Sequence, residues 1–192
     1  QTENVLGSIE GKEHPEEVVV LMAHYDHLGS SQGHIFHGAN DNASGTAAVL
    51  EVARALSEMS RAGYRPEKSI LFLLVTGEEK GLLGSRYYVG NPVFPISRTK
   101  VVVNLDMIGR SDFRHRESDQ YIYIDLPDSA GSPVHRICES VKATLGLDSL
   151  ALEYGFQGKT FAMGSSDHMS FPSGLPYVYY YNGIHSDLHK PS

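Results

Sequence analysis

Short apolar runs alternate with longer helical patterns along the whole chain. The apolar runs lie at residues 18–23, 70–77, 101–105 and 177–184 and are rich in β-branched or aromatic residues. Runs of this length, bounded by Gly, Asn or Pro, predict fully buried strands. The helical patterns lie at about residues 44–61, 82–89 and 133–145. This alternation predicts an α/β fold, a three-layer α/β/α sandwich whose central sheet is mixed but mostly parallel.

Weaker patterns fill the remaining segments. Residues 4–11 predict a half-buried edge strand and residues 121–124 a fourth internal strand, while 29–40 and 155–172 are predicted as loops. Asn42 or Ser44 is expected to cap the helix that starts near residue 44. No repeat or linker interrupts residues 1–192, so we expect one catalytic domain. Because the chain ends soon after its last strand, we also expect native segments to flank it.

The composition narrows the class of protein. The chain has 192 residues, of which 41% are hydrophobic and 20% charged, as in ordinary globular domains. Its net charge of −7 and its lack of a large Lys/Arg cluster argue against a nucleic-acid partner. No apolar stretch approaches the ~20 residues of a membrane-spanning helix. The single Cys138 excludes an intrachain disulfide and a zinc site built from several thiolates.

Five side chains of the types that bind metals stand just beyond the apolar runs. His24, Glu79, Asp106 and His185 each follow one run, and Asp41 lies in the loop before the first helix. In open α/β sheets, ligands bind beyond the carboxyl ends of the strands, so residues distant in sequence are expected to converge there. Taken singly, each signal is weak, because a lone histidine after a strand is more often an ordinary loop residue and a pair of glutamates is usually solvated. Asp106 is harder to dismiss, since a carboxylate within an apolar run needs a partner. Together they predict a metal site.

Imidazole and carboxylate ligands suit zinc, and five ligands exceed what one tetrahedral catalytic zinc uses. We therefore predict two zinc ions that share one carboxylate, with Asp41 as the best candidate for the bridge. Asp26 is two residues from His24 and is expected to orient it, through a hydrogen bond or a loop contact. Adjacent residues at a strand end point in different directions, so Glu79 is expected to bind metal while Glu78 faces the substrate as general base.

These residues lie in motifs that resemble those of the di-zinc exopeptidases typified by the bacterial secreted leucine aminopeptidases. The motifs are AHYDHLG at 23–29, GANDNASG at 38–45, TGEEKGLLGS at 76–85, NLDMIG at 104–109, SSDHMSF at 165–171 and GIHSDLHKPS at 183–192. Motifs in this order are highly specific and cover nearly the whole chain. The resemblance implies the zinc-exopeptidase (phosphorylase/hydrolase-like) fold. It also implies one zinc on His24 and Asp106, another on Glu79 and His185, and Asp41 as the bridge.

The resemblance implies further roles near the metals. Glu78 matches the general base, Asp26 matches the residue that supports His24, and the Asp41–Asn42 peptide bond is expected to be cis. Met107 is expected by family analogy to border the pocket for the first side chain of the substrate. Candidates for lining an apolar pocket are Phe156, Phe161, Met163 and Tyr181, although ordinary core or loop packing explains each of these four equally well.

Other residues of the motifs are assigned more modest roles. Asp167 and His168 are expected to support the wall of the site. His27 and His37 compete as ligands, but neither is needed once five ligands are placed.

The expected reaction is hydrolysis of the N-terminal residue of a peptide by a secreted or periplasmic enzyme, although no signal peptide is visible in the chain. Glutaminyl cyclases share the fold and similar motifs, but they use a single zinc and a tryptophan near the substrate, and this chain has no Trp. A carboxypeptidase for acidic C-termini would need basic pocket residues, for which Arg110, Arg114 and Lys159 are the candidates. A non-catalytic receptor-type module typically loses ligands or the base, and here all are present.

Overall fold

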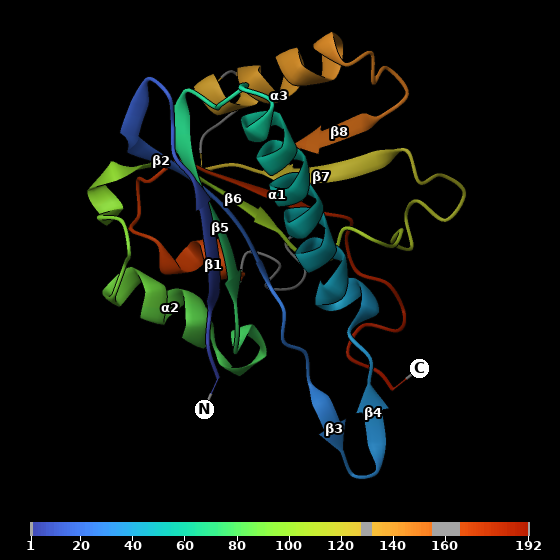
Figure 1. Cartoon of the computed structure of the whole chain (residues 1–192). Coiled ribbons are helices and arrows are strands. Elements are labelled where there is room, and N and C mark those ends of the chain that lie inside the picture. Colours follow the sequence, from blue (N-terminus) through green and yellow to red (C-terminus); the bar gives the residue numbers. More distant parts are fainter. Residues whose placement is uncertain (1, 128–131, 155–165, 192) are drawn as a thin grey trace.

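The computed structural model describes residues 2–127, 132–154 and 166–191. Seven strands form one sheet in the order β1-β5-β2-β6-β9-β7-β8 (Figure 1). The strands are β1 Val5–Ile9, β2 His14–His24, β5 Lys68–Val75, β6 Thr99–Leu105, β7 Tyr121–Asp125, β8 Ala151–Tyr154 and β9 Tyr177–Tyr181. Strands β5, β2, β6 and β9 are parallel, and β1 pairs antiparallel at the edge. Strand β7 is antiparallel to β9 and parallel to β8, so the predicted mixed, mostly parallel sheet is confirmed.

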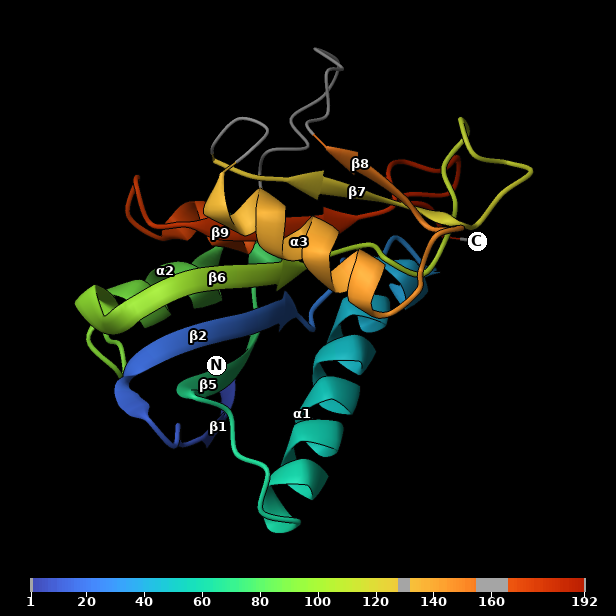
Figure 2. The same cartoon turned by 90° about the horizontal axis from the view of Figure 1, so that it is seen from above.

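Helices cover both faces of this sheet (Figure 2). Helices α1 (Gly45–Arg61) and α3 (Pro133–Thr144) pack on one face. Helix α2 (Leu83–Gly90) packs on the other, beside the 3₁₀ turn η4 (Asp167–Ser170). The three-layer sandwich expected from the sequence is therefore confirmed. Within the described ranges, no helix combines the length and the hydrophobicity that crossing a membrane requires.

The buried runs of the sequence serve both faces at once. Alternate residues of a strand point to opposite sides, so Val20 and Met22 of β2 pack with Tyr88 of α2. Ala23 of the same strand packs on the other face with Val49 of α1. Because both faces are covered, the strand reads in sequence as a continuous apolar run rather than an alternating one.

Three short strands were not expected from the sequence. Residues predicted as a loop form a hairpin of β3 (Gly29–Ser31) and β4 (His34–Phe36), which projects from the main sheet (Figure 1). The strand β8 pairs only with β7, at the edge of the sheet. Each of these strands has three or four residues, which is too short for an alternating pattern to stand out.

The apolar stripe of α3 is only partly buried. The sequence pattern places Val134, Ile137, Val141 and Leu145 on one side of this helix, but Ile137 is 61% and Val141 49% exposed. The helix packs on the sheet through Val134, a member of the stripe, and through Cys138, which is four residues further along and so shares its side. Ile137 and Val141 line a hollow of about 250 Å³ with residues of β7 and β8.

The core makes a first prediction. Leu73 of β5 is fully buried in the cluster around Met22 and Tyr88. We expect Leu73→Ala to lower the free energy of unfolding by about 2–5 kcal/mol, because hydrophobic transfer energy is lost and a cavity remains. Denaturant unfolding measures the change. The control is Leu50→Ala on α1, where Leu50 is 55% exposed and the expected change is below about 0.5 kcal/mol. Equal losses at the two positions would contradict this description of the core.

Candidate metal centre

The parallel strands end at the same edge of the sheet and bring distant residues together there. His24 is the last residue of β2, and Asp106 directly follows β6. Glu79 lies in a short 3₁₀ turn after β5, and Asp41 lies in the segment that leads into α1. Side chains up to 82 positions apart in sequence are thereby placed in contact.

The first group of ligand-type atoms is buried at the end of β2. The ring of His24 is 1% exposed, and its Nε2 lies 3.3 Å from Oδ1 of Asp41 and 3.3 Å from Oδ1 of Asp106. The other ring nitrogen, Nδ1, donates to the backbone carbonyl of Asp26 at 3.1 Å. This bond leaves Nε2 free to face the two carboxylates, so the group presents one nitrogen and two carboxylate oxygens to a common point.

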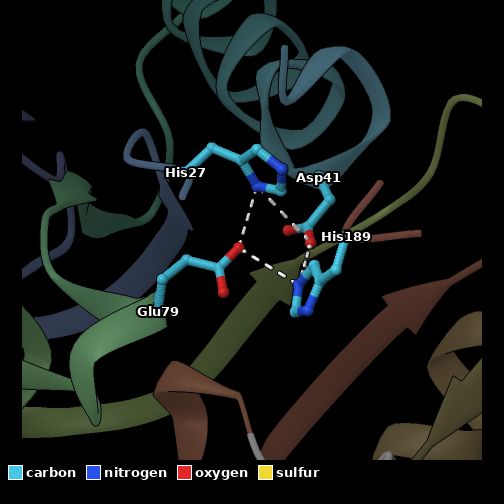
Figure 3. Close-up of side chains that lie close together, drawn as sticks. All are labelled: His27, Asp41, Glu79 and His189. Carbon is cyan, nitrogen blue, oxygen red and sulfur yellow. Dashed lines mark hydrogen bonds and ion pairs between the residues drawn. The ribbon is translucent and has the colours of Figure 1, made fainter. Parts of the chain in front are cut away.

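The second group shares Asp41 with the first and adds Glu79, His27 and His189 (Figure 3). Nε2 of His189 lies 3.0 Å from Oδ2 of Asp41 and 3.3 Å from Oε1 of Glu79. Nδ1 of His27 lies 2.8 Å from the same Glu79 oxygen. That nitrogen and that oxygen are buried, yet neither has a hydrogen-bond partner among the described residues. Buried polar atoms without partners call for an explanation. Here these atoms face a shared point, as the ligands of a single ion do.

His185, the fifth ligand expected from the sequence, lies beside these groups rather than in them. Its Nδ1 accepts the backbone N–H of Asp187 at 3.2 Å, and its Nε2 is buried without a hydrogen-bond partner. Both His185 and His189 follow the last apolar run and lie in the same motif. The strand end and the motif point to His185 in the sequence, and His189 is not singled out there, because the path of the loop that brings it back to Asp41 is not visible.

The Asp41–Asn42 peptide bond is cis, as expected. Asn42 then ties the bridging segment to its surroundings. Its Nδ2 donates to the carbonyl of Leu105 at 2.9 Å, and its Oδ1 accepts the backbone N–H of Gly45 at 3.0 Å and of Met107 at 3.2 Å. Of the two residues predicted to cap α1, Asn42 makes the capping bond. The same side chain therefore fixes the start of α1 and the backbone on both sides of Asp106.

Asp26 connects the two halves of the site. Its carboxylate accepts the backbone N–H of Glu78 at 3.1 Å and of Glu79 at 3.4 Å. Burial raises the pKa of Asp26, but hydrogen bonds with His24 and with the Glu78 backbone outweigh burial, so the net pKa is lowered. An ionised Asp26 thus holds the turn of the two glutamates against the end of β2.

A chain of hydrogen bonds supports Asp106 from behind. Oγ of Ser166 donates to Oδ2 of Asp106 at 2.8 Å, and Nδ2 of Asn104 donates to the same Oγ at 2.8 Å. Asp167 and His168 follow Ser166 in η4 and are 0% and 3% exposed. This placement agrees with the structural role expected for them. Ser166 and Asn104 were not singled out in the sequence, because only the fold brings them to Asp106.

The residues expected to contact the substrate lie in different surroundings. Met107 directly follows Asp106 and is mostly buried, with a positive φ of 58°. Tyr181 is 2% exposed and packs among other tyrosines of the sheet, so its side chain lies in the core. Phe156, Phe161 and Met163 lie outside the described residues. Beside Asp41 is a cavity of about 270 Å³, whose lining includes His27, His37, Arg110, His185 and His189.

The electrostatics of the two groups fit a divalent metal. Burial lowers the pKa of His24, but hydrogen bonds with Asp106, Asp26 and Asp41 raise it by more. Burial raises the pKa of Glu78 to about 8, to which the charge of Asp106 contributes, against the opposing effect of His24. The site therefore favours additional positive charge. Zinc accepts imidazole and carboxylate ligands together, so the residues present fit this metal.

Comparison with known proteins decides the family. The family model described as Peptidase family M28 matches residues 4–192. The chain belongs to peptidase family M28. Aminopeptidase YwaD of Bacillus subtilis is 35% identical over 173 residues, which cover 88% of this chain and 33% of the relative. Leupeptin-inactivating enzyme 1 of Streptomyces exfoliatus is 34% identical over 164 residues, which cover 84% of this chain and 32% of the relative.

The fold agrees with this M28 assignment. A crystal structure of a zinc aminopeptidase from Bacillus subtilis matches with a TM-score of 0.74 and 30% identity, covering 98% of this chain and 43% of that chain. The chain spans about a third of the length of the curated relatives it matches.

A second polar network surrounds His115 and is joined to the segment that carries His185 and His189. Nδ1 of His115 lies 3.0 Å from Oδ1 of Asp112, and its Nε2 lies 2.8 Å from Oε1 of Glu153. The ring stacks on Tyr121, with centroids 3.6 Å apart. The Tyr121 hydroxyl donates to the carbonyl of Asn182 at 2.6 Å, at the start of the segment that carries the last two site histidines. The network thus fixes one end of that segment.

The charge of His115 makes the network depend on pH. Burial lowers the pKa of His115, but hydrogen bonds to Asp112 and Glu153 outweigh burial and raise it. A histidine whose pKa is higher in the folded state stabilises the fold fully below its unfolded value of about 6.5. That stabilisation is lost as the pH rises through the folded value.

We expect Glu153→Gln to lower the pKa of His115, because one of its two carboxylate partners loses its charge. The pH at which the stabilisation disappears then moves down. An NMR titration of the His115 ring proton measures this shift. The control is Glu13→Gln, which removes an exposed carboxylate directly before β2. It should leave the His115 titration unchanged. An unchanged titration in Glu153→Gln would show that the pair does not persist in solution.

Proposed function

We propose that this chain is the catalytic domain of a zinc-dependent aminopeptidase, which hydrolyses the N-terminal residue of peptides with two zinc ions and Glu78 as general base. The observation that carries the proposal is the sharing of Asp41 by two groups of ligand-type atoms, with Glu78 next to one of the ligands. The names of the relatives, an aminopeptidase and a zinc aminopeptidase of known structure, support it. Because the sequence motifs resemble those of secreted bacterial aminopeptidases, we also propose a secreted or periplasmic location.

The ligand assignment follows the distances. One zinc would be held by His24, Asp106 and one oxygen of Asp41, and the other by Glu79, His189 and the second oxygen of Asp41. This assignment takes His189 in place of the His185 expected from the sequence. His189 approaches both Asp41 and Glu79, whereas His185 pairs with no carboxylate in the described part of the chain.

The residues of the chain divide the remaining work. When bound, the zinc pair supplies Lewis-acid polarisation of the scissile carbonyl and makes the attacking water more acidic. The Glu78 carboxylate accepts the proton of that water and delivers it to the leaving amine. Burial raises the pKa of Glu78, and two cations in the ligand groups would oppose this and favour the carboxylate form that accepts the proton. The carboxylate of Asp26 accepts the backbone N–H of Glu78 and so keeps Glu78 in place. The acidic surroundings attract the α-ammonium group of the substrate.

The general base is tested by Glu78→Gln. This variant keeps the size of the side chain and leaves the ligands intact, so we expect it to retain zinc while kcat falls by about 10²–10⁴-fold. Hydrolysis of leucine p-nitroanilide and the zinc content of the purified protein are measured together. Glu117→Gln, on the exposed loop before β7, is the matched control and should keep normal activity. A normal rate in Glu78→Gln would remove Glu78 from this role.

The reaction type is tested with three classes of substrate. We expect cleavage of aminoacyl p-nitroanilides. A chelator should abolish this cleavage and added zinc should restore it, because the bound zinc activates the attacking water. The two groups of ligands weigh against a single-zinc glutaminyl cyclase, and cyclisation of an N-terminal glutamine peptide would favour that enzyme instead. Release of a C-terminal glutamate would favour a carboxypeptidase. Arg110, a basic candidate for that substrate, is already paired with Asp187.

A further inference from the structure

In the proposed function, on which this inference rests, His27 has no role. We propose that His27 is a protein ligand of the zinc at Glu79. That metal would then have four protein ligands, His27, Asp41, Glu79 and His189, whereas the other has three, His24, Asp41 and Asp106. Zinc can expand to five ligands, so the metal at Glu79 would still take part in activating the water. The two metals would therefore differ in how tightly the protein holds them.

The distances around Glu79 fit four ligands of one ion. Zinc binds nitrogen and oxygen ligands at about 2.0–2.2 Å, so two ligands of one zinc lie about 3.3 Å apart at the tetrahedral angle and no more than about 4.4 Å apart. Nδ1 of His27 is 2.8 Å from Oε1 of Glu79 and 3.7 Å from Oδ2 of Asp41. The corresponding distances for His189 are 3.3 Å and 3.0 Å. His27 therefore lies closer than His189 to the Glu79 oxygen and farther from the Asp41 oxygen, and all four distances are within what two ligands of one zinc can span.

The ring of His27 is held in this position by its surroundings. Its side chain is 12% exposed, and Nδ1 is buried without a hydrogen bond although Glu79 is adjacent. Gly38 has a φ of +67°, and a Cβ at that position would lie 2.7 Å from the Cβ of His27. The glycine thus permits its backbone to lie close to His27, whose ring faces Glu79 in Figure 3.

His37 provides the contrast within the same loop. It also lines the cavity beside Asp41, but it is exposed and makes no ion pair with a carboxylate among the described residues. Of the two histidines that compete with the ligands predicted from the sequence, the geometry selects His27. A hydrogen bond from His27 to Glu79 is the alternative role, and the experiment is built to separate the two.

Zinc binding to the metal-free protein is measured by competition with a chromophoric chelator in wild type, His27→Ala and His27→Gln. Glutamine can donate a hydrogen bond to Glu79, but its amide is a poor zinc ligand. His34→Ala, an exposed histidine on β4, is the control. Cobalt(II) in place of zinc gives a second readout, because its visible absorption reports the number of ligands.

We expect wild type and His34→Ala to bind two zinc ions. In both His27 variants one zinc should bind at least about 10-fold more weakly, since even residues that only orient a ligand cost that much when replaced. The other zinc should bind as in wild type, which also shows that this edge of the sheet is folded. The cobalt absorption of one site should change in both variants.

Three results would overturn the assignment. Wild-type affinity in His27→Ala would show that His27 does not touch the metal. Wild-type affinity in His27→Gln alone would leave His27 as a hydrogen-bond donor to Glu79. Loss of both zinc ions in both variants would mean that His27 supports the whole loop. If wild type binds two zinc ions but cleaves no aminoacyl anilide, the proposed function fails while the metal readout still decides the role of His27.

Discussion

A single carboxylate, Asp41, belongs to both groups of ligand-type atoms, and the rest of the site is arranged around it. One of its oxygens faces His24 and the other faces His189. A side chain with partners on both sides tolerates little displacement, so the backbone around it must be fixed from several directions. Asn42 does this from one side by holding α1 and the segment after β6 at once. The position of Asp106 is therefore coupled to that of Asp41 before any metal is present.

The strands and the buried hydrogen bonds position the site in different ways. Parallel strands supply the direction, because their carboxyl ends meet at one edge and aim the following loops into the same region. Buried hydrogen bonds then set the orientation of individual groups, as Ser166 does for Asp106 and Asp26 does for the glutamate turn. The cost of gathering so many carboxylates is visible in the raised pKa of Glu78. That cost is offset when cations occupy the two groups, which couples metal binding to the stability of the site.

Much of the architecture was predictable because its signals are local. The runs that became β2, β5, β6 and β9 are buried on both faces, and their continuous hydrophobicity identified them without ambiguity. The short strand β8 and the β3–β4 hairpin gave no such signal. The stripe of α3 is buried only in part, at Val134, because an apolar stripe shows that a helix is amphipathic and leaves open how much of the stripe the sheet reaches.

The sequence by itself determined the fold class, the family and the four carboxylate or imidazole residues that stand at strand ends or before α1. Each of these depends on residues close together in the chain, where strand ends and motifs mark the position directly. Only the tertiary structure brought His189 to Asp41, His27 to Glu79 and Ser166 to Asp106. These residues lie on loops or in a short turn, and the direction in which such a segment returns depends on packing with distant parts of the chain. Spacing along the sequence carries no record of that packing, so these contacts became visible only when the chain was folded.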